Sequence, residues 1–175
     1  MPFTPFHLGP ALLFGLVFFR YLDFPTFLVA NVIVDIEPLV VLALGLDLPL
    51  HGFLHTFLGG TLVALLLASF MMRAGRSLGP LLGFFHLGQT QRRKGVYAAA
   101  LSGVYLHILL DARLHADIRP FYPSTANPLL SGSVFPGIEV YAFCVFSALT
   151  GAALYLLRVL IARDSALKRR GNGKS

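Results

Sequence analysis

The sequence predicts an all-α protein, a polytopic membrane bundle of about five transmembrane helices. Of its 175 residues, 56% are hydrophobic and only 13% are charged, whereas soluble domains carry roughly 25% charged residues. The mean hydropathy is +0.74. The apolar residues also fall in long runs, and a run of about 20 spans a bilayer. These observations exclude a soluble domain with an ordinary apolar core.

Five apolar runs are candidates for the spans. They cover residues 3–19, 25–46, 53–72, 96–111 and 134–161. In the first run, Pro5 and Pro10 shorten the part that can be helical. No basic residue precedes Arg20, so this run lacks the positive start of a cleaved signal peptide and is interpreted as a retained anchor.

The chain is expected to form one transmembrane domain, residues 1–163, with a basic cytoplasmic tail, residues 164–175. Residues 77–90 are apolar but short and contain Pro80, which favours an interfacial or re-entrant segment. Residues 116–132 contain three prolines, which exclude a regular helix there. Cys144 is the only cysteine, so no intrachain disulfide is possible.

The basic residues predict the orientation. If the N-terminus lies outside the cell and the five spans alternate, every Lys and Arg except Arg113 and Arg119 lies on the cytoplasmic side. This is the bias that the positive-inside rule describes. A multi-pass protein of the cell inner membrane, with the C-terminus in the cytoplasm, is therefore predicted. The net charge of +6 is explained by topology and membrane lipid, and no nucleic-acid partner is expected.

Ionisable side chains inside the predicted spans are the candidate functional residues, because each costs about 2.5 kcal/mol or more at the bilayer centre. They cluster toward the outer side. Asn31 and Asp35 lie one helical turn apart in the second span, and a break caused by Pro38 is expected to turn Glu37 toward the same place.

Histidines supply the rest of this polar set. His51 and His55 form a second pair, one helical turn apart, at the predicted start of the third helix. Imidazole and carboxylate are typical ligands of zinc, manganese and iron. We therefore predict a divalent metal ion, zinc or manganese, or two metals sharing a carboxylate. The predicted ligands are His7, Asp35, Glu37, His51, His55, His107, Asp111 and His115. The alternative is that these groups only form hydrogen bonds across the bundle or relay protons.

The order of these motifs resembles the YdjM-type family of inner-membrane metal-dependent hydrolases, also described as LexA-binding. The matching elements are Thr4-Pro5-Phe6-His7, Asp35-Ile36-Glu37-Pro38, His51-Gly52-Phe53-Leu54-His55-Thr56 and the run from Gly103 through His107 to Asp111, which continues to Arg119-Pro120. The resemblance covers roughly residues 3–130. Two positions depart from the family: Glu37 replaces Asp, and His115 stands where many members have Thr or another polar residue.

The resemblance implies a hydrolase, and the metal would supply a hydroxide from its bound water. In this hypothesis Glu37 is a ligand or the general base. Arg119 and Arg113 bind a phosphate and stabilise charge, although arginines that reach toward lipid headgroups are the simpler interpretation. A phospholipid or a lipid-linked phosphoester at the outer leaflet is then the natural substrate.

Two other functions are consistent with the same residues. A divalent-metal or proton transporter would use the ligands as a transit site, but the inner half of the predicted bundle offers few polar groups and the sequence has no inverted repeat. A non-catalytic structural protein would use them only to fix helix packing. Metal content and hydrolysis of a phosphodiester distinguish the three hypotheses.

Overall fold

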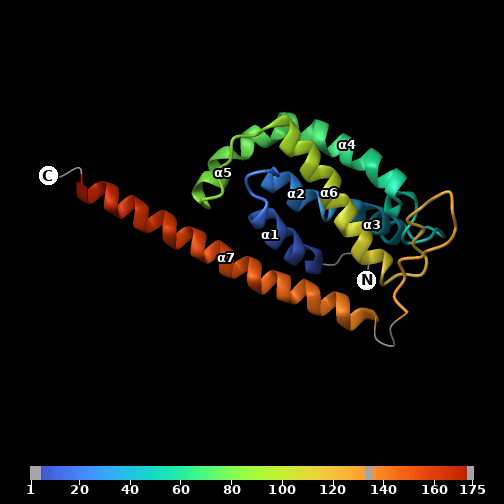
Figure 1. Ribbon diagram of the computed structural model, residues 1–175. Coiled ribbons are helices and arrows are strands. Elements are labelled where there is room, and N and C mark those ends of the chain that lie inside the picture. Colours follow the sequence, from blue (N-terminus) through green and yellow to red (C-terminus); the bar gives the residue numbers. More distant parts are fainter. Residues whose placement is uncertain (1–4, 133–135, 173–175) are drawn as a thin grey trace.

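The computed structural model describes residues 5–132 and 136–172, and over these residues the chain is helical and contains no strand (Figure 1). The α-helices are α1 (Leu8–Val17), α2 (Phe24–Ala30), α3 (Ile36–Ala43), α4 (Phe57–Ala74), α5 (Gly79–Phe84), α6 (Arg93–Ala112) and α7 (Pro136–Asn172). The short 3₁₀ helices are η1 (Pro5–His7), η2 (Ile33–Asp35), η3 (Phe53–His55) and η4 (Gly75–Leu78). The predicted all-α class is confirmed.

Within the described residues, four helical stretches are long and apolar enough to cross a membrane: Phe24–Ala43, Phe57–Phe84, Arg93–Ala112 and Gly137–Asp164. Helix α1 is a fifth apolar helix but a shorter one. The predicted run 3–19 thus contributes a helix only from Leu8, after η1; its residues 3–4, and residues 134–135 of the last run, lie outside the described part of the chain.

Helix α6 is the central helix of the bundle. It packs against α2 and α4, while α1 packs against α7 and α2 (Figure 1). The core between α2, α4 and α6 contains many small or β-branched side chains, including Ala30, Ala64, Val96, Val104 and Ile108. Small residues let membrane helices approach closely. Most of the large Leu and Phe side chains of α4 and α7 are instead exposed on the outer faces, which suits contact with lipid.

The second span is broken, but not where the sequence predicted. Pro38 lies in the first turn of α3, where its missing N–H has no helical partner to lose. The break lies earlier, between the end of α2 and η2. There the Asn31 side chain donates a hydrogen bond to the Phe27 carbonyl oxygen at 2.9 Å. The Asn31 backbone N–H also donates to this oxygen, at 3.2 Å, and the break that follows leaves Asp35 at a helix start.

His51 and His55 do not share a helical face, so that prediction is wrong. His55 ends η3, and α4 begins only at Phe57. The Thr56 hydroxyl caps α4 by accepting a hydrogen bond from the Gly59 N–H at 2.9 Å. The two histidines are therefore positioned by an irregular segment outside the helix.

Residues 77–90 form no complete span. Helix α5 has 6 residues, too few to cross a bilayer. The segment that follows docks on α7, where the Arg158 guanidinium donates to the His86 carbonyl oxygen at 3.0 Å. Gln89 joins it to the turn before α2 by donating to the Leu22 carbonyl oxygen, also at 3.0 Å. These bonds hold the segment at the end of the bundle that lies opposite the C-terminal end of α6 (Figure 1).

Helix α7 continues through Asn172, so residues 164–172 of the predicted tail are helical, and residues 173–175 lie outside the described part. At the other end of the bundle, residues 116–132 form the expected irregular loop. The Phe57 N–H donates to the Pro120 carbonyl oxygen at 2.8 Å, and the Asn127 side chain donates to the Ala112 carbonyl oxygen at 2.8 Å. The loop is thus fastened to the start of α4 and the end of α6.

Candidate metal centre

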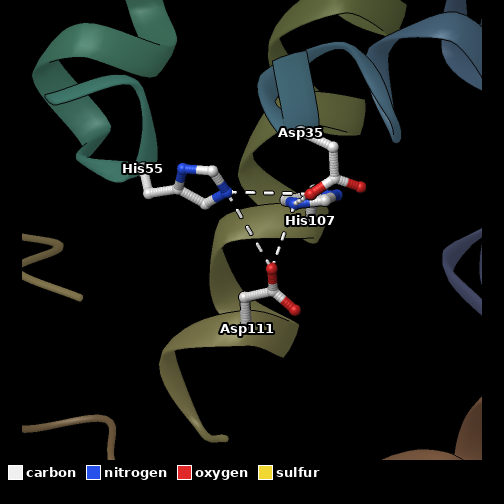
Figure 2. A group of neighbouring side chains, drawn as sticks. All are labelled: Asp35, His55, His107 and Asp111. Atoms are coloured by element: carbon white, nitrogen blue, oxygen red, sulfur yellow. Dashed lines mark ion pairs between the residues drawn. The ribbon is translucent and has the colours of Figure 1, made fainter. Parts of the chain in front are cut away.

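Four buried side chains from three parts of the chain converge at one place (Figure 2). Asp35 comes from the break before α3, His55 from the segment before α4, and His107 and Asp111 from successive turns of α6. Each offers one ligand atom, and these atoms all lie within 4.8 Å of one another. His55 and His107 have no exposed surface. The structure therefore brings together four of the predicted metal ligands.

The spacing of the donor atoms suits a small cation. His107 Nε2 lies 3.2 Å from Asp111 Oδ2 and 3.4 Å from Asp35 Oδ1. His55 Nε2 lies 3.9 Å from the same Asp35 oxygen and 4.0 Å from Asp111 Oδ2. Two ligands that each lie about 2.1 Å from a tetrahedral zinc are about 3.4 Å apart. The observed separations lie around that value.

The partners of the two imidazoles determine which nitrogen faces the centre. His107 Nδ1 lies 2.7 Å from the Asn31 carbonyl oxygen, which can only accept, so Nδ1 carries the proton. His55 Nδ1 lies 2.9 Å from Glu37 Oε2, a carboxylate oxygen that likewise accepts. In the neutral rings, both Nε2 atoms are then left with a lone pair. Metal-binding histidines commonly have this arrangement.

Three polar atoms at the centre are buried without a hydrogen-bond partner among the described residues. They are His55 Nε2, His107 Nε2 and Asp35 Oδ2. A buried polar atom without a partner costs about 1–3 kcal/mol. A cation among these atoms would remove that cost and would neutralise the buried carboxylates. This donor set therefore fits the divalent metal that the sequence predicts.

Glu37 is not one of the four converging residues but contacts one of them, His55. Its carboxylate accepts the His55 Nδ1 proton and the backbone N–H groups of Gly52, at 3.0 Å, and Leu54, at 3.1 Å. A Cβ at position 52 would lie 2.7 Å from Glu37 Oε1, so a larger residue there would displace this carboxylate. The predicted ligand and general base is placed where it orients His55.

His7 also occupies a supporting position. Its Nε2 lies 3.1 Å from Asp111 Oδ1, while the other oxygen of Asp111 faces His107. The rings of His7 and His107 are 4.3 Å apart. The structure thus places His7 against the centre through Asp111, and η1 carries it there at the start of α1.

The remaining predicted ligands lie in a second group nearer the surface. His51 and His115 have ring centroids 4.3 Å apart, and His51 Nδ1 lies 2.9 Å from Asp117 Oδ2. His51 also contacts His55, with ring centroids 4.8 Å apart. The predicted metal ligands therefore form two groups, one buried and one nearer the surface, and His51 of the second group contacts His55 of the first.

Asp117 is a polar partner that the sequence did not mark as a ligand. Its only signal is its position two residues after His115 in a loop rich in proline. Partial burial raises the pKa of its carboxyl, but the hydrogen bond with His51 outweighs this, so that the pKa lies below its ordinary value. Asp117 is therefore ionised at neutral pH and available to a cation.

Arg113 and Arg119 differ in their surroundings. The Arg113 guanidinium lies 3.4 Å from Glu139 Oε2 and is half-exposed, so it is already paired. Arg119 is exposed and lines a cavity of about 400 Å³, together with His51, Asp117 and Tyr122. Of the two arginines proposed to bind phosphate, only Arg119 borders this cavity.

No protein-family model, no curated protein and no solved structure matches this chain. The resemblance to the YdjM-type family therefore stays a prediction that rests on the motifs.

Proposed function

We propose that the chain is a membrane-embedded metal-dependent hydrolase that acts on a phospholipid or a lipid-linked phosphoester at the outer leaflet of the cell inner membrane. The observation that carries the proposal is that two buried imidazole Nε2 atoms, which make no hydrogen bond among the described residues, lie 3.2 to 4.0 Å from carboxylate oxygens of Asp35 and Asp111. Zinc or manganese is the divalent ion that such donors favour.

The chain's own residues would divide the work as follows. Asp35, His55, His107 and Asp111 would hold the ion, which when bound lowers the pKa of its water from 15.7 to about 7. Glu37 and the Asn31 carbonyl keep the two imidazoles in the tautomer that presents Nε2. Arg119, beside the cavity, offers a positive charge to a phosphate.

The distribution of charge supports the proposed orientation. The centre lies near the C-terminal end of α6, whereas Arg92, Arg93 and Lys94 lie at its N-terminal end. The positive-inside rule then places the centre in the outer half of the membrane and the C-terminus in the cytoplasm. A lipid substrate would reach the cavity from the outer leaflet.

The test measures metal content and hydrolysis on the same purified full-length protein. After dialysis we expect one tightly held zinc or manganese per chain by elemental analysis, and hydrolysis of a short-chain phospholipid or of bis(p-nitrophenyl) phosphate. His107→Ala and Asp111→Asn should lose the ion and lower the rate by about 100-fold or more. His86→Asn, a histidine change far from the centre at a positive φ that Asn tolerates, is the control.

Protein that never retains a metal would refute the proposal. Protein that retains the ion but hydrolyses no phosphoester would refute the hydrolase and leave transport or structural support as the function of the centre.

A further inference from the structure

A second set of metal-type donors lies outside the buried centre. His51, His115 and Asp117 each offer one ligand atom, and the three atoms lie within 4.8 Å of one another. They come from the segment before η3 and from the turn after α6, parts of the chain that the fold brings together. None of the three belongs to the group around His107.

The packing partly organises these donors. His51 is 5% exposed, so its ring is held in place. The ring of His115 stacks on it at 33°, and Asp117 Oδ2 lies 2.9 Å from its Nδ1. His115 is half-buried and Asp117 is exposed. Because these two side chains are at the surface, they can move by the short distance that coordination of one ion requires.

The cavity of about 400 Å³ provides the access that such a site needs. His51 and Asp117 line it, and Arg119 and Tyr122 stand on its wall. Three protein donors leave at least one position of a tetrahedral ion open. An ion at this place would therefore face the cavity with a vacant position, beside the positive charge of Arg119.

We propose that His51, His115 and Asp117 form a second divalent-cation site beside this cavity and next to the buried centre. The site takes zinc or a similar borderline metal, because two of its three donors are imidazoles. It binds more weakly than the buried centre, since it has one donor fewer and stands in contact with solvent. It is adjacent to the first site through the His51–His55 ring contact.

The test is a zinc titration of chelator-treated full-length protein in detergent micelles, followed by calorimetry and by elemental analysis at saturation. Wild-type protein should bind two zinc ions per chain with separate affinities. His115→Ala and Asp117→Ala should each remove the weaker site and keep the tight one. His107→Ala should do the reverse. His86→Asn should bind two ions like the wild type.

A second readout reports on the ligands themselves. Cobalt in place of zinc gives visible absorption bands that depend on its ligands, so the bands gained on filling the weaker site should be missing from His115→Ala. A single site in wild-type protein, or two sites that survive both His115→Ala and Asp117→Ala, would overturn the proposal.

The result separates this inference from the proposed function. Binding of the second ion is measured without substrate, so a protein with two ions and no hydrolysis keeps the second site and loses the hydrolase. A protein with one ion and full hydrolysis would support the hydrolase and overturn the second site.

Discussion

At the scale of single residues, the centre depends on the groups behind the ligands. His55 presents Nε2 because Glu37 accepts from Nδ1, and Glu37 is itself held by two backbone N–H groups. The same role at His107 falls to a backbone carbonyl, that of Asn31. Groups of this kind fix the tautomer and the ring orientation of a metal ligand.

Glu37→Gln tests this support. The amide keeps the size of the side chain but removes the negative charge that faces the His55 N–H, so zinc affinity at the buried centre should fall by about 10–100-fold. Competition with a coloured chelator measures the change. Glu139→Gln, which removes a half-exposed carboxylate on α7, is the matched control. Equal affinities for the two variants would mean that Glu37 does not act through His55.

The same scale explains what the sequence missed. The polar side chain of Asn31 points to a role for that side chain, but it bonds to the Phe27 carbonyl oxygen, and the Asn31 backbone oxygen is the atom that contacts His107. Every residue has a backbone carbonyl oxygen, so the residue type at position 31 could not predict that this oxygen accepts from His107. Asp117 looked like an ordinary loop acid because its partner, His51, is 66 positions away in the sequence.

At the scale of helices, the contact between α2 and α6 places His107 against Asn31. Gly103 makes this approach possible, because a Cβ there would lie 2.6 Å from the Ala30 Cβ and 3.0 Å from the Phe27 carbonyl oxygen. Phe27 and Ala30 lie on α2, just before the break that carries Asp35. A larger residue at 103 would therefore separate the helices and the ligands together.

Gly103→Ala is expected to destabilise the protein by about 1–3 kcal/mol, the usual range for overpacking, and to weaken zinc binding with it. Unfolding can be followed through Cys144, the only cysteine, which is buried and becomes reactive to a thiol dye when the bundle opens. Gly83→Ala, in α5, is the control because nothing lies within 4 Å of its Cβ position. A Gly103→Ala protein as stable as the control would contradict this role.

At the scale of the whole molecule, the exterior of the bundle is apolar and its interior is polar near one end. Apolar side chains cover the outer faces of α4 and α7, while the imidazoles and carboxylates meet inside the bundle near one end. A bilayer accommodates both, since it solvates the exterior and makes buried charge costly unless it is paired. Most basic residues lie toward the opposite end, so the two ends of the bundle differ in charge.

The proposed topology predicts which loops are reachable from outside the cell. In a Cys144→Ala background, Thr125→Cys should react with a membrane-impermeant maleimide in intact cells, because the loop that carries it lies at the end with the centre. Ser77→Cys, also exposed and between α4 and α5, should react only after the membrane is opened. The reverse labelling pattern would mean that the protein has the opposite orientation, with the centre on the cytoplasmic side.

The helical class, the apolar segments and the residue types of the centre could all be predicted from the amino-acid sequence. Hydropathy is a property of local composition, so segments such as 96–111 could be located without knowing what surrounds them. The importance of His55, His107, Asp35 and Asp111 followed from the cost of ionisable groups among apolar residues.

The division of those residues between two groups depends on how the helices and loops pack together. Helical spacing paired His51 with His55, yet the backbone between them is not a continuous helix, and contacts with distant parts of the chain assign them to different groups. The break before Asp35 and the supporting positions of Glu37 and His7 have the same origin. Local pattern determines what a segment is, but only packing against distant segments decides where its polar atoms lie.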